Sequence, residues 1–261
     1  MMNTNTALIT GASAGIGLEL ARIHAQKGGD LVLVARSKNK LESLKLELEE
    51  TYKIKVIVVS EDLSLTGAAE RVFQQTERQG IEVNTLINNA GFGGHGFFNE
   101  RNLEDEQAMM QVNMVALTQL THYYLQGMVS RQSGRIMNVS STASFMPGPL
   151  QAVYYATKAY VTSFTQALAE EVSEHNISAT ALCPGAVATG FVKAGNLEGV
   201  KIWKNAKTPS SVAQFGYQAM EKGKLVAINE GKLAFLLNWI VPLLPRKVML
   251  KTSRQAMEKS A

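Results

Sequence analysis

The sequence predicts an α/β fold in which a parallel sheet is covered by helices on both faces. Short runs rich in β-branched residues alternate with longer amphipathic segments along most of the 261 residues. This alternation is typical of parallel strands joined by crossover helices. The run LVLVA at residues 31–35 is apolar throughout, as expected of a strand covered on both faces. No proline occurs before Pro147, which fits regular elements throughout the first half.

Right-handed crossovers arrange these elements as a doubly wound, Rossmann-like sheet. Seven strands are expected, at residues 6–10, 31–35, 55–59, 85–88, 135–139, 178–183 and 225–228. Helices are expected at residues 15–27, 39–52, 64–79, 103–129, 153–174 and 209–222. In the second helix Leu41, Leu44 and Leu48 recur at helical spacing, and Ser37 is positioned as its N-cap.

Residues 1–261 are expected to form a single domain, because α/β folds of roughly 250 residues occur as one unit. With 46% hydrophobic and 18% charged residues, the composition excludes disordered, collagen-like and coiled-coil proteins. Two stretches depart from the strand–helix pattern. Residues 190–208 lack clean periodicity, which predicts a lid-like segment, and residues 231–261 form a tail that is apolar and then basic.

The formal net charge of +4 is unevenly distributed. Residues 1–190 hold 14 basic and 18 acidic side chains, a net charge of −4, whereas residues 191–261 hold 12 and 4, a net charge of +8. A general nucleic-acid binder would carry basic stripes through its fold. We therefore expect no nucleic-acid partner. The basic tail points instead to an acidic substrate, a membrane surface or a subunit contact.

The cysteine content and the apolar runs bear on location. Cys183 is the single cysteine, so no intrachain disulfide can form, which fits a cytoplasmic protein. The first ten residues lack the basic segment and apolar run of a secretory signal. The longest apolar stretch, residues 233–244, is interrupted by Asn238 and Pro242 and is shorter than the roughly 20 residues that span a bilayer.

A glycine-rich loop, TGASAGIG, separates the first strand from the first helix. Backbone amides at a helix N-terminus bind anions, and glycines let a pyrophosphate approach closely. The spacing of Gly11, Gly15 and Gly17 is G-x-x-x-G-x-G, which differs from the common dinucleotide fingerprint. By itself the loop is equally consistent with a tight turn, and its place between strand and helix favours a nucleotide site.

Arg36 follows the second predicted strand. An acidic residue at this place would read a ribose hydroxyl, whereas a guanidinium suits a 2′-phosphate. We therefore predict NADP(H) in preference to NAD(H). A solvated surface arginine is the alternative.

Tyr154 and Lys158 are four residues apart in a predicted helix and share one of its faces. An adjacent ammonium favours the phenolate and lowers the pKa of a tyrosine, which suits acid–base work on a carbonyl oxygen. Ser141, thirteen residues earlier, can hold that oxygen by a hydrogen bond. Chance pairs of this spacing are common. Tyr155 is a competing tyrosine but leaves Ser141 at the wrong spacing.

Over residues 4–230 the sequence resembles the short-chain dehydrogenase/reductase family. The matching segments are TGASAGIG at 10–17, Asp62-Leu63, NNAG at 88–91, Asn113, NVSS at 138–141, YYATK at 154–158 and PGAVAT at 184–189. The resemblance implies a catalytic tetrad of Asn113, Ser141, Tyr154 and Lys158. Tyr154 would be the acid/base, Lys158 would lower its pKa and bind the nicotinamide ribose, and Asn113 would hold a helix distortion and a relay water.

The resemblance also implies which residues hold the cofactor. From the loop these are Gly11, Ser13, Gly15, Ile16 and Gly17. The remaining positions are Asp62 and Leu63 toward the adenine, Asn89, Ala90 and Gly91 at the adenine ribose, and Pro184, Gly185, Val187 and Thr189 at the nicotinamide. They join Arg36, which is assigned above to the 2′-phosphate. Without the resemblance, Asn89 would be assigned to a turn and Asn113 to a helix surface.

The tail departs from many members, which end soon after the seventh strand with a glycine-rich segment used in tetramers. Here about thirty residues follow Gly231, as in a subgroup with steroid and long-chain acyl reductases that pair through long helices. We therefore expect a homodimer rather than a tetramer. No metal is expected, because the histidines, His24, His95, His122 and His175, show no ligand spacing.

These observations predict an NADPH-dependent oxidoreductase acting on a small-molecule carbonyl or alcohol. An apolar substrate is expected from a set of apolar residues in the segments around the site: Phe92, Phe97, Met146, Leu150, Phe191 and Trp203. Two alternatives stay open. One is a non-catalytic NADP(H)-binding regulator. The other is a peripheral membrane reductase attached through its tail, where apolar and basic residues alternate between 232 and 255.

Overall fold

A computed structural model of the protein describes residues 5–259, apart from the side chain of residue 204. Seven parallel strands form one sheet in the order β3-β2-β1-β4-β5-β6-β7. Their bounds are β1 Thr6–Thr10, β2 Asp30–Ala35, β3 Val56–Ser60, β4 Thr85–Asn88, β5 Gly134–Val139, β6 Ile177–Leu182 and β7 Val226–Ala227. The predicted doubly wound sheet is confirmed, and each predicted strand lies within two residues of its place.

The larger helices connect these strands. Their bounds are α1 Gly15–Gln26, α2 Lys38–Tyr52, α3 Ala68–Arg78, α4 Leu103–Met110, α5 Leu117–Arg131, α6 Ala152–Glu171 and α8 Pro209–Glu221. The predicted helix 64–79 begins late, because Gly67 adopts a left-handed backbone with φ of +77°. Ser37 does stand at the N-cap of α2, but its side chain makes no capping hydrogen bond.

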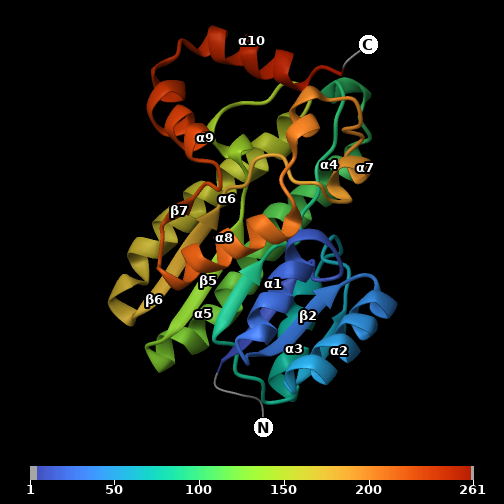
Figure 1. Cartoon of the computed structure of the whole chain (residues 1–261), viewed down its shortest axis with the longest axis vertical. Helices are drawn as coiled ribbons and strands as arrows, with labels where there is room; N and C mark the ends of the chain where they lie inside the picture. Colours follow the sequence, from blue (N-terminus) through green and yellow to red (C-terminus); the bar gives the residue numbers. More distant parts are fainter. Residues whose placement is uncertain (1–4, 260–261) are drawn as a thin grey trace.

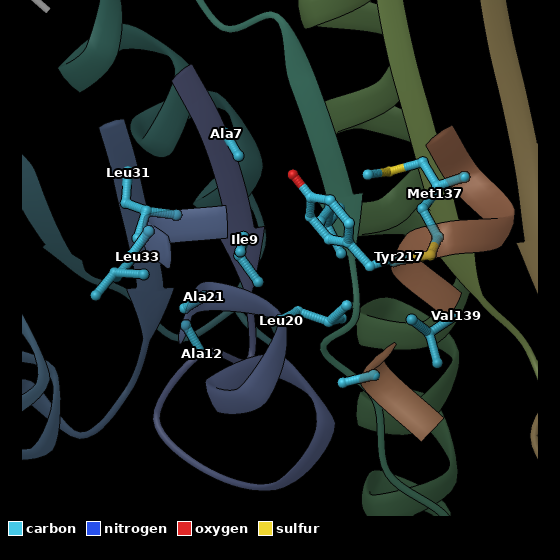
Figure 2. Close-up of a cluster of buried hydrophobic side chains, with 14 of the residues drawn as sticks. Ala7, Ile9, Ala12, Leu20, Ala21, Leu31, Leu33, Met137, Val139 and Tyr217 are labelled. Carbon is cyan, nitrogen blue, oxygen red and sulfur yellow. The ribbon is translucent and has the colours of Figure 1, made fainter. Parts of the chain in front are cut away.

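Helices cover both faces of the sheet (Figure 1). Apolar side chains of α1, α2 and α8 pack on one face, and those of α3, α5 and α6 pack on the other. Alternate residues of each strand supply the two cores, as Leu8 and Ile9 of β1 do. Figure 2 shows part of the first core, with labelled side chains from β1, β2, β5, α1 and α8. Burial of these faces is the main force that holds the sheet between its helices.

The predicted helix 103–129 is interrupted by a π-helical turn, η2, at Gln111–Ala116, which joins α4 to α5. Because α4 ends at Met110 and α5 begins at Leu117, the turn is continuous with both helices and is a local distortion rather than a break. Insertions of this kind occur most often at functional sites. Asn113 lies within the turn.

The segment at 190–208 contains α7 Phe191–Ala194 and the 3₁₀ turn η5 Lys201–Asn205. After β7 the tail forms α9 Gly231–Phe235, the π turn η6 Leu236–Ile240, the 3₁₀ turn η7 Val241–Leu243, and α10 Arg246–Met257. Figure 1 shows α9 and α10 at one end of the molecule, with α10 above α7. The end of the tail pairs with the lid-like segment through a bridge between Val200 and Lys259.

No helix within residues 5–259 has the length and apolar content needed to cross a membrane. In the same part of the chain no group of three His, Cys, Asp or Glu residues is placed to hold a metal ion. His24 is buried and lies 2.8 Å from the Tyr217 hydroxyl. His95 contacts the backbone oxygen of Met257 at 2.8 Å. Both histidines therefore serve packing contacts between segments.

Candidate active site

A cavity of about 390 Å³ lies beside the carboxyl ends of the strands. It is lined by the loop after β1, the loop after β4, the end of β5, the first turns of α6 and the segment after β6. Strand order reverses between β1 and β4, and doubly wound sheets bind ligands at such a switch point. The topology alone therefore brings segments from residues 11 to 203 around one hollow.

Most of the predicted site residues line this cavity. They are Gly11, Gly15, Ile16, Arg36, Asn89, Ala90, Gly91, Ser141, Tyr154, Lys158, Pro184, Gly185, Val187 and Thr189. Five predicted residues lie outside its lining: Ser13, Gly17, Asp62, Leu63 and Asn113. The contacts of these five explain why they stand back from the cavity.

The glycine loop lies at the N-terminus of α1 and depends on glycine at three positions. Gly11 and Gly15 adopt positive φ angles of +67° and +59°, which other residues reach only with strain. Gly17 is buried, and a Cβ there would lie 2.5 Å from the Gly11 oxygen. Gly17 therefore permits close packing within the loop rather than contact with a ligand. The first amides of α1 remain available to an anion.

Asn89 joins the glycine loop to the loop after β4. Its side-chain amide donates to the backbone oxygen of Thr10 at 2.8 Å. The Thr10 hydroxyl in turn accepts hydrogen bonds from the backbone amides of Asn89 and Ala90 at 3.0 and 2.9 Å. These bonds hold the two loops in a fixed relation, so the cavity wall between them is formed in advance of binding.

Arg36 extends from the end of β2 with its side chain 76% exposed. Its guanidinium lies 3.9 Å from an Asp62 carboxylate oxygen, a loose contact that leaves most of its donors free. Burial raises the pKa of Asp62, but hydrogen bonds from Ser64 and the charge of Arg36 outweigh burial and hold it below its ordinary value. Ser13 faces a separate hollow beside α2, and Leu63 packs in the core.

Asn113 is buried in the π turn and holds the loop after β4. Its amide donates to the Phe92 oxygen at 3.0 Å and to the Thr157 hydroxyl at 3.1 Å. Its oxygen accepts a hydrogen bond from the Phe92 amide at 3.2 Å. Through these hydrogen bonds Asn113 links η2, α6 and the loop after β4, behind the cavity wall.

Ser141 follows β5 and caps the 3₁₀ turn η3 at Thr142–Phe145. Its oxygen accepts a hydrogen bond from the amide of Ala143 at 3.1 Å. It also hydrogen-bonds the hydroxyl of Tyr154, an interaction that lowers the pKa of that tyrosine. The serine hydroxyl also donates toward the backbone oxygen of Pro184 at 3.5 Å, so it is held between η3, the segment after β6 and the tyrosine.

Tyr154 is buried in the first turn of α6, among Met109, Ala143 and Phe191. Burial raises the pKa of Tyr154 well above its ordinary value, and the hydrogen bond with Ser141 only partly offsets this effect. The neighbouring Lys158 does not reverse this effect: the net pKa of Tyr154 is raised, because removal of the phenolate from water outweighs the other influences. Tyr154 is therefore protonated at neutral pH.

Lys158 lies one helical turn beyond Tyr154 and is also buried. Its ammonium donates to the backbone oxygen of Val139 at 2.8 Å and lies 5.8 Å from the centre of the Tyr154 ring. Burial lowers the pKa of Lys158 from 10.5 to about 8. The site thus places a proton donor, a hydroxyl and a cation beside one another at the cavity wall.

A family model described as short chain dehydrogenase matches residues 5–198. The chain belongs to the short-chain dehydrogenase family. It is 30% identical over 249 residues to a very-long-chain 3-oxoacyl-CoA reductase of Macaca fascicularis, covering 94% of this chain and 77% of that protein. It is 28% identical over 235 residues to a 7beta-hydroxysteroid dehydrogenase of Mediterraneibacter gnavus, with 89% of each chain covered.

Among solved structures, a short-chain dehydrogenase from Sphingobium yanoikuyae in complex with NADPH superimposes with a TM-score of 0.84. The identity is 29%, and 97% of this chain and 98% of that chain are covered. These relatives carry the names of oxidoreductases, so this short-chain dehydrogenase is an oxidoreductase. Their names favour neither a non-catalytic regulator nor a reductase attached to a membrane by its tail.

The apolar side of the dehydrogenase cavity is only partly as predicted. Phe92, Phe191 and Trp203 line it. Phe97 lies outside it, beneath the guanidinium of Arg254. Met146 and Leu150 also lie outside: Met146 packs on the tail, and Leu150 packs beside the buried end of α10. Packing against the tail therefore removes from the cavity two residues whose place in the chain had assigned them to it.

Some lining residues escaped sequence reasoning, among them Ala143, Gln151 and Ile202. Gln151 precedes α6 and stands one turn before Tyr154, so helical spacing could have found it. Tyr155 lines the cavity as well, and its ring also packs against the cluster that contains Met257 of α10. No sequence pattern identifies Ile202 as a lining residue, because its position depends on how the lid-like segment folds against the cavity.

Proposed function

We propose that this short-chain dehydrogenase is an NADPH-dependent reductase of apolar carbonyl compounds, which also oxidises the corresponding alcohols. The observation that carries the proposal is the convergence of the glycine loop, Arg36, Ser141, Tyr154 and Lys158 on one cavity. The glycine loop, whose backbone amides can bind an anion, lies at one part of this cavity, and the proton donor Tyr154 lies at another. The proposal includes a single domain at residues 1–261.

The residues present fit NADP(H). The glycine loop presents amides at the start of α1, and a Cβ at Gly15 would lie 3.1 Å from the Thr189 side chain, so the passage there suits only a glycine backbone. Arg36 would meet a 2′-phosphate, because its guanidinium is exposed and held by one loose ion pair. Asn89, Ala90 and Gly91 would line the ribose side, and Pro184, Gly185, Val187 and Thr189 would hold the nicotinamide.

When bound, NADPH supplies the hydride that becomes attached to the carbonyl carbon. Tyr154 then completes the reduction by giving its hydroxyl proton to the carbonyl oxygen. Its raised pKa suits this direction, because the tyrosine carries its proton throughout the neutral range. Ser141 donates to the same oxygen and holds it near the tyrosine. In alcohol oxidation the tyrosine accepts the proton instead.

The phenolate left on Tyr154 needs stabilisation, since it forms in a buried place. Lys158 supplies a positive charge 5.8 Å from the ring centre. Asn113 lies behind the cavity wall. It hydrogen-bonds Phe92 and Thr157, and so fixes the distance between the loop after β4 and α6. A relay water beside Asn113 is part of the proposal.

The substrate is proposed to be apolar from the chemistry of the cavity wall. Phe92, Phe191, Ile202 and Trp203 form its outer part. Among the described lining residues Arg36 and Lys158 are charged, and both are assigned to the cofactor and the proton transfer. No carboxylate or further cation in that lining is left to recognise a small charged ketone. The two relatives that act on acyl and steroid groups support the same choice.

We further propose a cytoplasmic homodimer. The pairing surface would be the outer side of α5 and α6, where Thr118 and Tyr160 join the two helices by a 2.8 Å hydrogen bond. Rings of Tyr160 and Phe164 stack there with centres 5.8 Å apart, giving a flat, partly apolar face suited to a partner. A dimer is favoured over a tetramer because the tail occupies the region that follows β7.

An activity screen tests this proposal. Purified protein and NADPH are offered a panel of ketones, aldehydes and acyl thioesters, with Tyr154→Phe as the blank. We expect oxidation of NADPH with bulky apolar carbonyls and little with small charged ketones. Binding of NADPH without turnover on any member of the panel would contradict a reductase and favour a regulator.

A further inference from the structure

The tail carries an apolar surface that the described protein leaves uncovered. From α9 to η7 the chain is helical, and its inner side packs through Leu237 and Val241 against Cys183 and Ile228. A helical segment with one apolar side buried usually turns a polar side to water. Here the opposite side is apolar as well, so burial against the enzyme body accounts for only half of the segment.

Large side chains fill this outer side. Phe235, Trp239 and Leu243 recur every four residues and are 61%, 68% and 82% exposed. Leu236 and Ile240 lie beside them and are exposed too. Single exposed apolar residues are ordinary, but a contiguous group of this size marks a contact surface. We call Phe235, Leu236, Trp239, Ile240 and Leu243 the tail patch.

The charge around the tail patch is of one sign. Residues 231–257 contain five cations, Lys232, Arg246, Lys247, Lys251 and Arg254, and no acidic residue. All five are exposed. Within the described residues, Lys232, Arg246, Lys247 and Lys251 form no ion pair with a carboxylate. These four cations are therefore free to meet a negative partner, whereas Arg254 pairs with Glu258 at 3.3 Å.

The body of the enzyme has the opposite balance, with a net charge of −4 over residues 1–190. Figure 1 shows α9 and α10 at one end of the molecule, away from the strands of the sheet. A negative surface would attract this end and repel the rest. The charge distribution thus orients the molecule with its tail toward such a surface.

A second copy of the chain fits this surface poorly. A two-fold contact places the same patch on both sides, so the four unpaired cations would face a second set of four, while Arg254 is already paired with Glu258 at 3.3 Å. Like charges placed together in an interface oppose association. The partner must therefore be apolar in its interior and negative at its boundary.

We propose that the tail patch docks on an anionic lipid surface. Trp239, Phe235 and Leu243 enter the boundary between headgroups and acyl chains, a place that amphipathic aromatic rings favour. Lys232, Arg246, Lys247 and Lys251 contact the headgroup phosphates. The helix lies along the surface and does not cross it. This inference goes beyond the proposed reaction and does not depend on it.

Vesicle sedimentation with the full-length protein tests the proposal. One set of vesicles contains phosphatidylcholine, and the other contains phosphatidylcholine with phosphatidylglycerol. We expect binding to the second set that weakens steeply with added salt, because the headgroup contacts are exposed to solvent. In a Trp203→Phe background, which leaves Trp239 as the single tryptophan, its emission shifts to the blue on binding and is quenched by brominated acyl chains.

Two paired variants separate the apolar and charged contributions. Trp239→Ser/Leu243→Ser removes the deepest contacts, and Arg246→Glu/Lys247→Glu reverses two charges. Each exposed cation contributes about fivefold in affinity at an anionic membrane, so losing two should weaken binding by at least roughly 25-fold. The matched controls are Leu46→Ser on α2 and Lys222→Glu/Lys224→Glu after α8, which are exposed and lie outside the tail. Thermal melting and NADPH binding report that every variant is folded.

Several results would overturn the proposal. Equal binding to both vesicle sets, or unchanged binding by both paired variants, would contradict docking of the tail patch on an anionic lipid surface. So would a protein that ignores vesicles but loses a dimer in Trp239→Ser/Leu243→Ser, since the tail patch would then join two copies. Binding of soluble polyglutamate as tight as that of vesicles would assign the tail to an acidic protein partner.

Discussion

The ammonium of Lys158 lies 5.8 Å from the centre of the Tyr154 ring and donates a 2.8 Å hydrogen bond to the backbone oxygen of Val139. The lysine is thus held by β5 while it faces a residue one helical turn before it. Burial lowers its pKa to about 8 and raises the pKa of Tyr154. The pair is arranged so that a protonated tyrosine stands next to a cation at neutral pH.

Activity should depend on the charge of Lys158. Carbonyl reduction is expected to decline as the pH rises through about 8, because the ammonium that stabilises the Tyr154 phenolate loses its proton there. The pH profile of kcat measures this. Lys158→Arg, whose charge persists to high pH, should show a lower rate without the decline. A wild-type profile that stays flat to pH 10 would oppose this role.

Lys158 should also leave a signature in stability. The unfolded lysine has a pKa near 10.5 and the folded one about 8, so the unfolded state binds more protons between these values. The free energy of unfolding contributed by Lys158 therefore rises with pH across that window. Relative to Lys158→Met, the wild type should gain about 3 kcal/mol between pH 7 and 10.5.

Denaturant titrations of the two proteins at several pH values measure this difference. The comparison cancels the groups that both proteins share. If the gap between them does not change with pH, the lysine is neither buried nor shifted as the structure has it.

Arg36 should select the cofactor. Arg36→Ala is expected to weaken NADPH binding by roughly 10- to 100-fold, the value of a hydrogen bond to a charged group, while NADH binding changes little. Fluorescence titration with each cofactor measures the two dissociation constants. Lys38→Ala, two residues away and also exposed, is the matched control. Tighter binding of NADH than of NADPH by the wild type would make this assignment wrong.

Gly17 should tolerate no side chain. In Gly17→Ala the new Cβ would lie 2.4 Å from the Asn89 amide nitrogen and 2.5 Å from the Gly11 oxygen. We expect destabilisation of about 1–3 kcal/mol from overpacking, together with loss of NADPH binding as the loop shifts. Gly231→Ala, where a Cβ meets nothing within 4 Å, should leave both quantities unchanged. Melting curves and cofactor titrations test the two variants side by side.

Ile202 should contribute to substrate preference. It lines the cavity and is 41% exposed, so Ile202→Ser removes apolar contact without disturbing the core. We expect kcat/KM for a bulky apolar ketone to fall about tenfold, as for the loss of one or two methylene contacts, with little change for a small ketone. Leu225→Ser, at a similar exposure outside the cavity, is the control. A uniform loss on both substrates would indicate damage to the lid rather than specificity.

The sequence predicted the sheet well because its strands are short and buried. Periodicity and flanking glycines locate a run such as residues 31–35 without knowledge of its neighbours. Asn113 shows the limit. A helix pattern covers residues 103–129, yet a π turn interrupts it, and only the hydrogen bonds to Phe92 and Thr157 reveal why the turn is needed.

The candidate site was predicted where motifs carry backbone constraints, as at Gly11 and Gly15, and less well where tertiary packing decides. Met146 and Leu150 are near Tyr154 in the chain, but the tail packs against one and α10 against the other. The net pKa of Tyr154 is likewise decided by packing. Spacing places a cation beside the ring, but it does not give the depth of burial that raises the pKa.

The central claim is that Tyr154 delivers the proton to a carbonyl oxygen, and Tyr154→Phe tests it most directly. The measurement is the rate of NADPH oxidation with the best ketone of the panel, together with NADPH affinity, for wild type and variant. We predict a rate lower by about 10²- to 10⁴-fold with unchanged NADPH affinity, because the ring stays in place. A variant that oxidises NADPH at the wild-type rate would contradict the account.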